Sequence, residues 1–235
     1  MVDNVNVEEG LFKDKENILD DLSKMYDESL YCDITFTLTD NVSVSTNRFM
    51  LACRIPYFDT MLFGQYAEKS SSTVPLECCD SEVFKKILDF VWKGEISFTN
   101  MKIMAVLDIL ETSCFFCIDL LVDGIVDNLR HLFETNQVEH EEWLLALDFI
   151  IQHKFTTVTC SILNCIDKNL TAVSSLPEFT NLSECSMIAL LDLPFWDGFA
   201  TTSGHIDIFQ AFVKWIENKD SLPVNIKQKM LRMFL

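Results

Sequence analysis

Glycine and proline are scarce in this sequence, and acidic residues outnumber basic ones two to one. Only six glycines and five prolines occur in 235 residues, which leaves little material for the many turns of an all-β sandwich. The 18 Lys and Arg residues face 36 Asp and Glu residues, giving a formal net charge of −18 and a pI near 4.4. Nucleic acids and anionic membrane surfaces attract basic proteins, so this chain is predicted to bind neither.

A long apolar run is also missing. The longest uncharged stretch, Phe155 to Ile166, contains Thr, Ser and Asn, whereas a membrane-spanning helix needs roughly 20 mostly apolar residues. The first ten residues are acidic and do not resemble a secretory signal. Hydrophobic residues still make up 49% of the chain, enough for a real core. We therefore expect a folded protein of the cytoplasm or nucleus without membrane insertion.

Nine cysteines are present, most of them within apolar segments such as Leu51–Cys53 and Cys160–Cys165. Secreted disulfide-rich proteins are usually short and dense in cysteine, so this pattern favours buried, reduced thiols in a reducing compartment. Cys114 and Cys117 form a CxxC pair without a second pair at zinc spacing. We interpret them as buried thiols rather than a metal or redox site, and we expect no cofactor.

Catalytic patterns are weak. The four histidines are scattered, and none is spaced as the base of a nucleophile. The stretch from His140 to Trp143 lacks the second histidine of a zinc protease, and the glycines are too far apart for a phosphate-binding loop. We expect a protein without enzymatic activity, and a cysteine hydrolase or metalloprotein is the least favoured class.

The hydrophobic pattern predicts a small sheet with helices, followed by an all-helical remainder. Steps of seven, four and three between apolar residues predict an amphipathic helix over residues 11–28. Alternation predicts a strand at 32–38, and the turn signal Asp40-Asn41 predicts a hairpin with a second strand at 42–45. A short strand at 73–76 contains proline and is expected at a sheet edge. The other expected helices are 47–62 (one or two, interrupted at Pro56), 80–94, 101–112, 117–133, 138–153, 155–168, 183–192, 205–218 and 223–234.

Several segments, taken in order, resemble the BTB/POZ domain followed by a BACK domain, as in Kelch-type adaptors. The segments that carry the resemblance are Tyr31–Phe36, Asn47–Ala52, Tyr57-Phe58 and Phe84–Gly94 for BTB/POZ, and Glu178-Phe179, Met187–Leu193 and Asp207–Trp215 for BACK. Asn47 and Trp92 depart from the family pattern, which has His and Tyr there. The resemblance covers about residues 15–235.

The resemblance implies an α+β fold in which a small, mostly antiparallel sheet flanked by helices precedes an all-α BACK domain. It divides the chain into an N-terminal dimerisation helix (1–28), a BTB/POZ domain (29–133) and a BACK domain (134–235). Family members usually carry a substrate-reading domain after BACK. Because this sequence stops at Leu235, we expect a fragment or a short form.

A two-fold homodimer is the first function that the resemblance implies. The residues that match the dimer contacts are Leu11, Ile18, Leu22 and Met25 of the first helix, with Asp33 and Arg48 as a charged pair lining the dimer cleft. A buried charge is costly unless it is paired, so this pair is expected to neutralise itself and to be structural rather than part of a ligand pocket. The alternative for the helix is that its apolar stripe packs on its own chain.

Binding to the cullin scaffold of a ubiquitin ligase is the second implied function. Tyr66, Ala67 and Glu68 match a hydrophobic-x-Glu motif, and Val138 belongs to a segment that resembles the short helical box extending the cullin groove. Phe115 and Phe116 are expected to add to the same contact. The alternative is an exposed loop whose tyrosine has no partner.

These expectations combine into one functional hypothesis. The chain is predicted to be a non-enzymatic, homodimeric adaptor that links a cullin-RING ubiquitin ligase to a substrate protein, with the BACK half as a semi-rigid spacer. The second hypothesis is a dimeric scaffold that recruits regulatory partners without a ligase.

Overall fold

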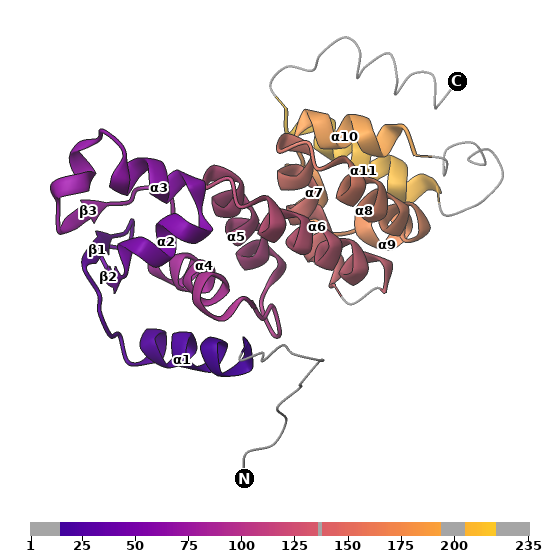
Figure 1. Ribbon diagram of the computed structural model, residues 1–235. Helices are drawn as coiled ribbons and strands as arrows, with labels where there is room; N and C mark the ends of the chain where they lie inside the picture. The colour runs from indigo at the N-terminus through magenta and orange to yellow at the C-terminus, as the bar shows by residue number, and fades with distance from the viewer. Residues whose placement is uncertain (1–14, 136–137, 194–204, 220–235) are drawn as a thin grey trace. The chain divides into compact units, whose positions relative to one another are not determined.

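The computed structural model describes residues 15–135, 138–193 and 205–219, which fall into two compact units (Figure 1). The first unit comprises the chain up to Met101 together with Asp108–Val122, and the second comprises Lys102–Leu107 and the chain from Asp123 onward. Helices α5 (Ile103–Phe115) and α6 (Asp119–Glu134) therefore contribute residues to both units. Leu11 and the helix predicted at 223–234 lie outside the described residues.

A three-stranded sheet in the order β2-β1-β3 forms part of the first unit (Figure 1). Strand β1 (Ile34–Thr37) pairs antiparallel with β2 (Ser43–Thr46) and parallel with β3 (Thr73–Pro75). The predicted hairpin is confirmed, and the proline-containing strand lies at an edge as expected. Phe36 of β1 is fully buried, so the apolar face of the sheet turns into the core, and the predicted α+β class is confirmed.

Short polar and Pro/Gly signals set the helix boundaries in the first unit. Pro56 separates two helices because it occupies the first turn of the second one, where its missing N–H costs nothing. Asp80 caps the long helix by accepting a hydrogen bond from the Val83 amide at 2.9 Å, and Gly94 ends it with a φ of 72°. The helices are α1 (Lys15–Asp27), α2 (Arg48–Arg54), α3 (Pro56–Phe63), the 3-10 helix η1 (Ala67–Ser70) and α4 (Ser81–Lys93).

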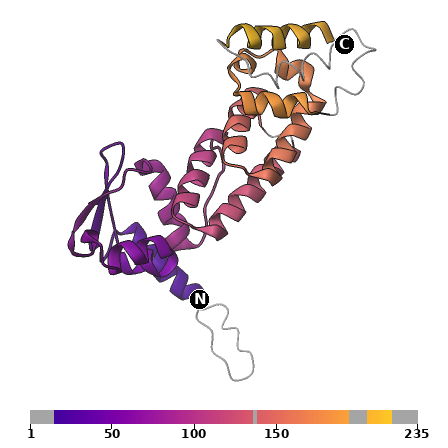
Figure 2. The ribbon, with the colours of Figure 1, turned by 90° about the horizontal axis from the view of Figure 1, so that it is seen from above.

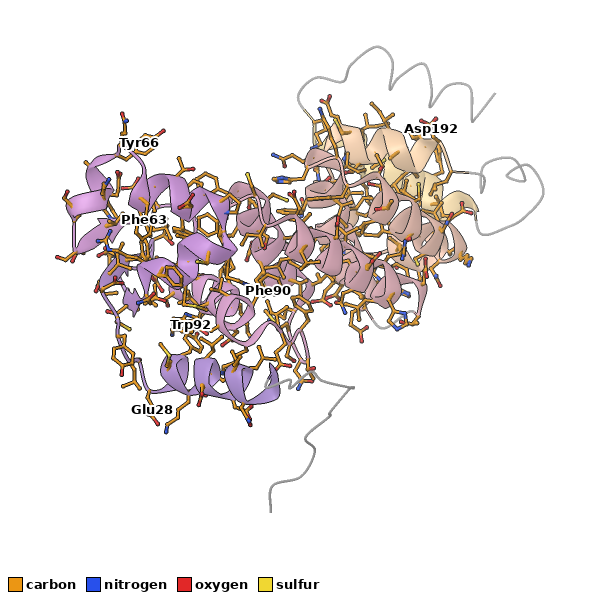
Figure 3. The ribbon with its side chains drawn as sticks, in the orientation of Figure 1. Glu28, Phe63, Tyr66, Phe90, Trp92 and Asp192 are labelled. Atoms are coloured by element: carbon orange, nitrogen blue, oxygen red, sulfur yellow. The ribbon has the colours of Figure 1, made fainter. Side chains whose placement is uncertain are left out.

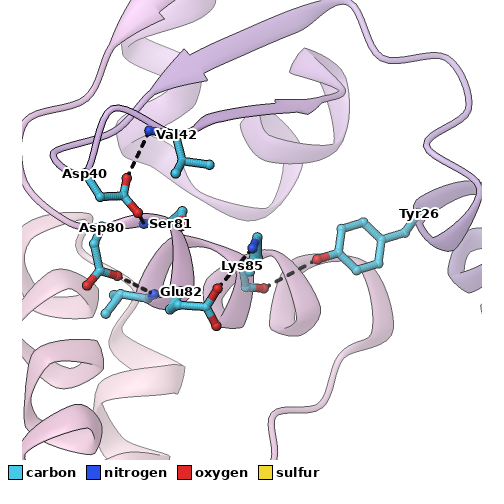
Figure 4. Close-up of polar contacts among 8 residues, drawn as sticks. Tyr26, Asp40, Val42, Asp80, Ser81, Glu82 and Lys85 are labelled. Atoms are coloured by element: carbon cyan, nitrogen blue, oxygen red, sulfur yellow. Dashed lines mark hydrogen bonds and ion pairs between the residues drawn. The ribbon is translucent and has the colours of Figure 1, made fainter.

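The end of α1 packs on α4 of the same chain. The ring of Tyr26 stacks on Trp92 with centroids 5.9 Å apart. The Tyr26 hydroxyl donates to the Lys85 carbonyl at 3.4 Å (Figure 4). Lys93 forms an ion pair with Asp27 at 2.9 Å. Burial raises the pKa of Tyr26, and nearby carboxylates raise it further. The C-terminal part of α1 is therefore held by its own chain.

Four phenylalanines fill the core of the first unit. Phe58 lies 5.5 Å from Phe36 and 4.9 Å from Phe116, and Phe36 lies 5.4 Å from Phe84, all as ring centroids. All four side chains are fully buried. Such edge and tilted contacts each add about 0.5–1.5 kcal/mol beyond the burial of area. The cluster joins the sheet to α3, to α4 and to Phe116, the residue that follows α5.

The second unit is helical throughout its described residues (Figures 1 and 2). Trp215 is buried and donates its indole N–H to the Leu182 carbonyl at 2.9 Å, and Phe179 meets Phe212 at 5.2 Å. Two of its elements were not predicted, because segments of five residues are too short to show a helical period. The elements are α7 (His140–Gln152), α8 (Thr156–Lys168), α9 (Leu170–Ser174), the 3-10 helix η2 (Pro177–Asn181), α10 (Glu184–Leu191) and α11 (His205–Glu217).

The cysteines are more exposed than predicted. All nine are unpaired thiols; six are exposed and only Cys79 is buried. The interpretation of Cys114 and Cys117 as buried thiols is wrong, since both lie exposed near the end of α5. The reason is geometric: neighbours in sequence point to different sides of a helix, so an apolar segment does not guarantee that each of its residues is buried.

Candidate protein-interaction site

The segment Tyr66-Ala67-Glu68 lies at the surface of the first unit. Tyr66 directly precedes η1, and its side chain is 61% exposed; Figure 3 shows its ring pointing away from the ribbon. Ala67 is exposed and Glu68 is half-buried. The expected exposure of Tyr66 is confirmed, while its part in binding stays a prediction.

Arg48 fixes the backbone of this segment through hydrogen bonds. Its guanidinium donates to the carbonyl oxygens of Glu68 and Lys69 at 3.3 Å each, and also to that of Ser71. A planar guanidinium presents several N–H donors in a fixed fork, so one side chain anchors three peptide groups. The role that the structure gives to Arg48 is to position the Tyr66 segment.

The predicted buried pair of Asp33 and Arg48 is wrong. Asp33 is exposed, and its carboxylate accepts from the backbone amide of Arg48 at 2.8 Å instead of from the guanidinium. The first amides of a helix lack internal partners and attract negative charge. Asp33 therefore assists Asn47, which accepts from the Met50 amide at 3.1 Å, in capping the start of α2.

A cavity of about 690 Å³ brings distant parts of the first unit together beside the Tyr66 segment. Glu68 of η1, Tyr57 of α3 and Phe115 of α5 contribute to its lining. Phe115 is 52% exposed, and its ring lies 5.4 Å from that of Tyr57. Burial raises the pKa of Tyr57, with the neighbouring Cys78 and Glu68 adding to the rise. We call Tyr66, Glu68 and Phe115 the Tyr66 face.

Phe116 and Val138 do not lie on this face. Phe116 has no exposed area and packs 5.2 Å from Tyr57, and Val138 is only 8% exposed within the second unit. Their predicted place on a contact surface is therefore corrected, because neither side chain reaches a partner at the surface. Phe116 instead supports Tyr57 from the core, which the sequence did not distinguish because two adjacent phenylalanines look alike.

The predicted dimer residues of α1 divide into two groups. Ile18 is 54% exposed, and its neighbour Leu19 is 50% exposed. Leu22 and Met25 are half-buried, and Met25 lines a cavity of about 570 Å³ together with Trp92 of α4. The C-terminal part of the helix thus packs on its own chain, whereas its earlier turns leave an apolar face uncovered.

The described residues show neither a metal centre nor a membrane-spanning helix. Within them, no group of three or more His, Cys, Asp or Glu side chains is placed to hold a metal ion. His140 and His153 pack against aromatic rings, 4.4 Å from Trp143 and 4.3 Å from Phe149. Among the same ranges, no helix is both long and apolar enough to cross a membrane.

Comparison with known proteins identifies the class. Residues 22–132 match the family model of the BTB/POZ domain, so the chain contains a BTB/POZ domain, a module of protein interaction. The chain is similar to BTB/POZ domain-containing protein 9 of Bos taurus, with 26% identity over 192 residues that cover 81% of this chain and 30% of that protein. It is also similar to human Kelch-like protein 2, with 22% identity over 209 residues, or 84% of this chain and 31% of that protein.

A similar solved structure covers about half of the chain. The match to the BTB domain of human gigaxonin covers 52% of this chain and 98% of the gigaxonin chain, with 19% identity and a TM-score of 0.43. This chain spans about 30% of the length of the curated relatives named above. The predicted BTB/POZ fold is confirmed by the family model, and the assignment of residues 134–235 to a BACK domain stays a prediction.

Proposed function

We propose that this chain is a homodimeric BTB–BACK adaptor that links the cullin scaffold of a cullin-RING ubiquitin ligase to a substrate protein in the cytoplasm or nucleus. The observation that carries the proposal is the Tyr66 face. There, the glutamate of the family-like motif lines a cavity together with the exposed ring of Phe115, and the exposed tyrosine lies two residues before that glutamate.

The chemistry of this face fits a protein contact. Exposed aromatic side chains that become buried in a complex supply most of the binding energy at typical hot spots. The Glu68 carboxylate contributes charge that orients the partner and speeds association. The three carbonyl contacts of Arg48 hold the segment in place before binding, which lowers the entropic cost of association.

Dimerisation is proposed to use the uncovered face of α1. Ile18 and Leu19 are both at least half exposed, and contiguous apolar side chains at a surface often mark an interaction site. Residues 134–235 are proposed to be the BACK domain, which would separate the ligase contact from the bound substrate.

Calorimetry against a cullin N-terminal domain tests the ligase contact. Tyr66→Ala is expected to weaken binding by at least about 2 kcal/mol, roughly 30-fold, because it removes a hot-spot aromatic. Stability should change by no more than about 0.5 kcal/mol, as at other surface sites. Tyr66→Phe keeps the ring and should retain most of the affinity. Val42→Ala, which shortens an exposed side chain at the hairpin turn, should leave binding unchanged.

Two outcomes would redirect the proposal. If the wild-type chain shows no binding to a cullin, the second function takes precedence: a dimeric scaffold that recruits regulatory partners without a ligase, which the uncovered face of α1 supports independently. If Tyr66→Ala binds as tightly as the wild type, the contact lies elsewhere on the domain.

A further inference from the structure

Two adjacent cysteines, Cys78 and Cys79, lie between β3 and α4, and the first of them lines the cavity of the Tyr66 face. Cys78 is half-buried and lines the cavity, and Cys79 is 7% exposed. The surrounding backbone is fixed, because the Cys79 carbonyl accepts from the Thr39 amide at 3.2 Å and the next residue, Asp80, caps α4. The two thiols are thus presented together by a rigid corner of the fold.

The side chains of this pair interact with each other. A hydrogen bond from the Cys79 thiol to the Cys78 sulfur lowers the pKa of Cys78 and raises that of Cys79. Consecutive Cα atoms are about 3.8 Å apart, short of the roughly 4.4–6.8 Å that unstrained disulfides span. The pair therefore resists forming its own disulfide. The lowered pKa of Cys78 favours its thiolate, which is a soft nucleophile.

We propose that Cys78 and Cys79 form a dithiol site for neutral trivalent arsenic compounds of the arsenoxide class. Soft thiolate ligands prefer soft, thiophilic centres, and adjacent sulfurs can close a small ring through one arsenic atom. Two S–As bonds form, the arsenic–oxygen bond breaks, and the oxygen leaves as water with the two thiol protons. No atom changes its oxidation state, so the step needs no oxidant or reductant.

The cavity selects the rest of the ligand. Tyr57, Met61 and Phe115 give it an apolar wall that suits an aromatic substituent on the arsenic. Glu68, Glu77 and Glu111 also line it, and none of the lining residues in the described part of the chain is basic. Like charges repel within a partly enclosed site, so a neutral aryl arsenoxide is expected to bind better than one that carries a carboxylate.

Titration of the full chain with phenylarsine oxide tests the site. Intact-mass spectra at graded concentrations should show one phenylarsenic group per chain at the tightest site, with loss of two protons, and dimercaptopropanol should remove it. Closing the ring makes the second bond intramolecular, which raises affinity by about 10²–10⁴-fold. Cys78→Ala is therefore expected to weaken binding at least about 100-fold, and Cys79→Ala should do the same. A para-carboxyl derivative should bind the wild type more weakly than the parent compound.

The exposed CxxC pair provides the matched control. The double variant Cys114→Ala, Cys117→Ala should bind like the wild type, and so should Tyr66→Ala, since the dithiol site does not depend on cullin binding. The proposal is overturned if Cys78→Ala retains wild-type affinity, if removal of the CxxC pair abolishes the adduct, or if no tight adduct forms. Because Cys79 is buried and its loss can unfold the chain, Cys78→Ala with an unchanged melting temperature is the deciding variant.

Discussion

Single polar side chains hold loops of the BTB/POZ domain to its helices. Arg48 ties α2 to the carbonyl groups that follow Tyr66. Asp40 does the same at the hairpin turn, where its carboxylate accepts from the amides of Val42 and Ser81, both at 3.2 Å (Figure 4). The Arg48 contacts and the Asp40–Ser81 contact join segments that lie far apart in the sequence. Each variant below therefore tests the placement of a surface loop.

Arg48→Lys is expected to loosen the Tyr66 segment. A lysine carries its donors on one nitrogen and cannot reach three carbonyl groups in the same fork, so amides of residues 66–71 should exchange faster with deuterium. Loss of these charged hydrogen bonds should lower the free energy of unfolding by about 1–3 kcal/mol. Arg54→Lys on the same helix is the control, because this arginine is exposed and donates to a single backbone carbonyl within the described residues, that of Phe90 at 3.5 Å. Equal exchange in both variants would refute the positioning role.

Asp40 predicts a pH-dependent contribution to stability. Hydrogen bonds from the Ser81 side chain, and then from backbone amides, lower the pKa of Asp40. A carboxyl whose folded pKa lies below its unfolded value of about 3.9 contributes stability above that value, and the contribution disappears as the pH falls through the folded pKa. Asp40→Asn should therefore melt below the wild type at pH 7, with the gap narrowing below about pH 4. A difference in melting temperature that does not depend on pH would contradict this prediction. So would an equal difference for Asp20→Asn, at an exposed position of α1.

At the scale of elements, α1 has two surfaces with different roles. Its last turns pack on α4 through Tyr26 and Trp92, whereas Ile18 and Leu19 remain exposed. Deleting residues 1–28 would remove both surfaces and bare Trp92, so loss of the dimer and loss of stability would occur together. Point substitutions separate them.

The double variant Ile18→Asp, Leu19→Asp is expected to be monomeric. Charges on an apolar contact are costly to bury, whereas at exposed positions they change stability by only about 0.5 kcal/mol. Light scattering at tens of micromolar, chosen because many such contacts have a Kd of about 1 μM, measures the result. Asp20→Asn with Asp21→Asn on the same helix should stay dimeric. A wild-type chain that is monomeric in this range would disprove the proposed dimer.

At the scale of the whole molecule, the chain combines several exposed thiols with a large excess of acidic residues. Six of nine cysteines are exposed, and the formal net charge is −18. Exposed thiols pair readily in oxidising compartments, so their number supports the expectation of a reducing environment. The predicted burial of the cysteines supports it less, because only Cys79 is buried.

All nine thiols are expected to be reduced in the native protein. Alkylation of the denatured chain without reductant should add nine groups in the intact mass, one for each cysteine. Brief alkylation of the native chain should label the exposed thiols first and Cys79 last, because access controls the rate. A reproducible disulfide would count against the proposed compartment.

The sequence by itself determined the longer elements and where most of them end, but not the short helices η1, α9 and η2. Periods of 3.6 and 2 residues are local properties, and they located the hairpin and the longer helices. Pro56, Asp80 and Gly94 act within one turn of the backbone, so the breaks that they cause were also predictable. The order of these elements, with a few matching residues, was enough to indicate the BTB/POZ fold.

Only the tertiary structure decided which side chains meet and which reach the surface. The guanidinium of Arg48 binds carbonyl groups some twenty residues away, whereas Asp33 accepts from the backbone amide of Arg48. Of two adjacent phenylalanines, one is exposed and the other buried. Cys78 lies in one cavity with Tyr57 and Phe115, although each comes from a different segment. Such contacts depend on how separate elements pack. The hydrophobic pattern of one segment does not identify the segments that lie next to it in space.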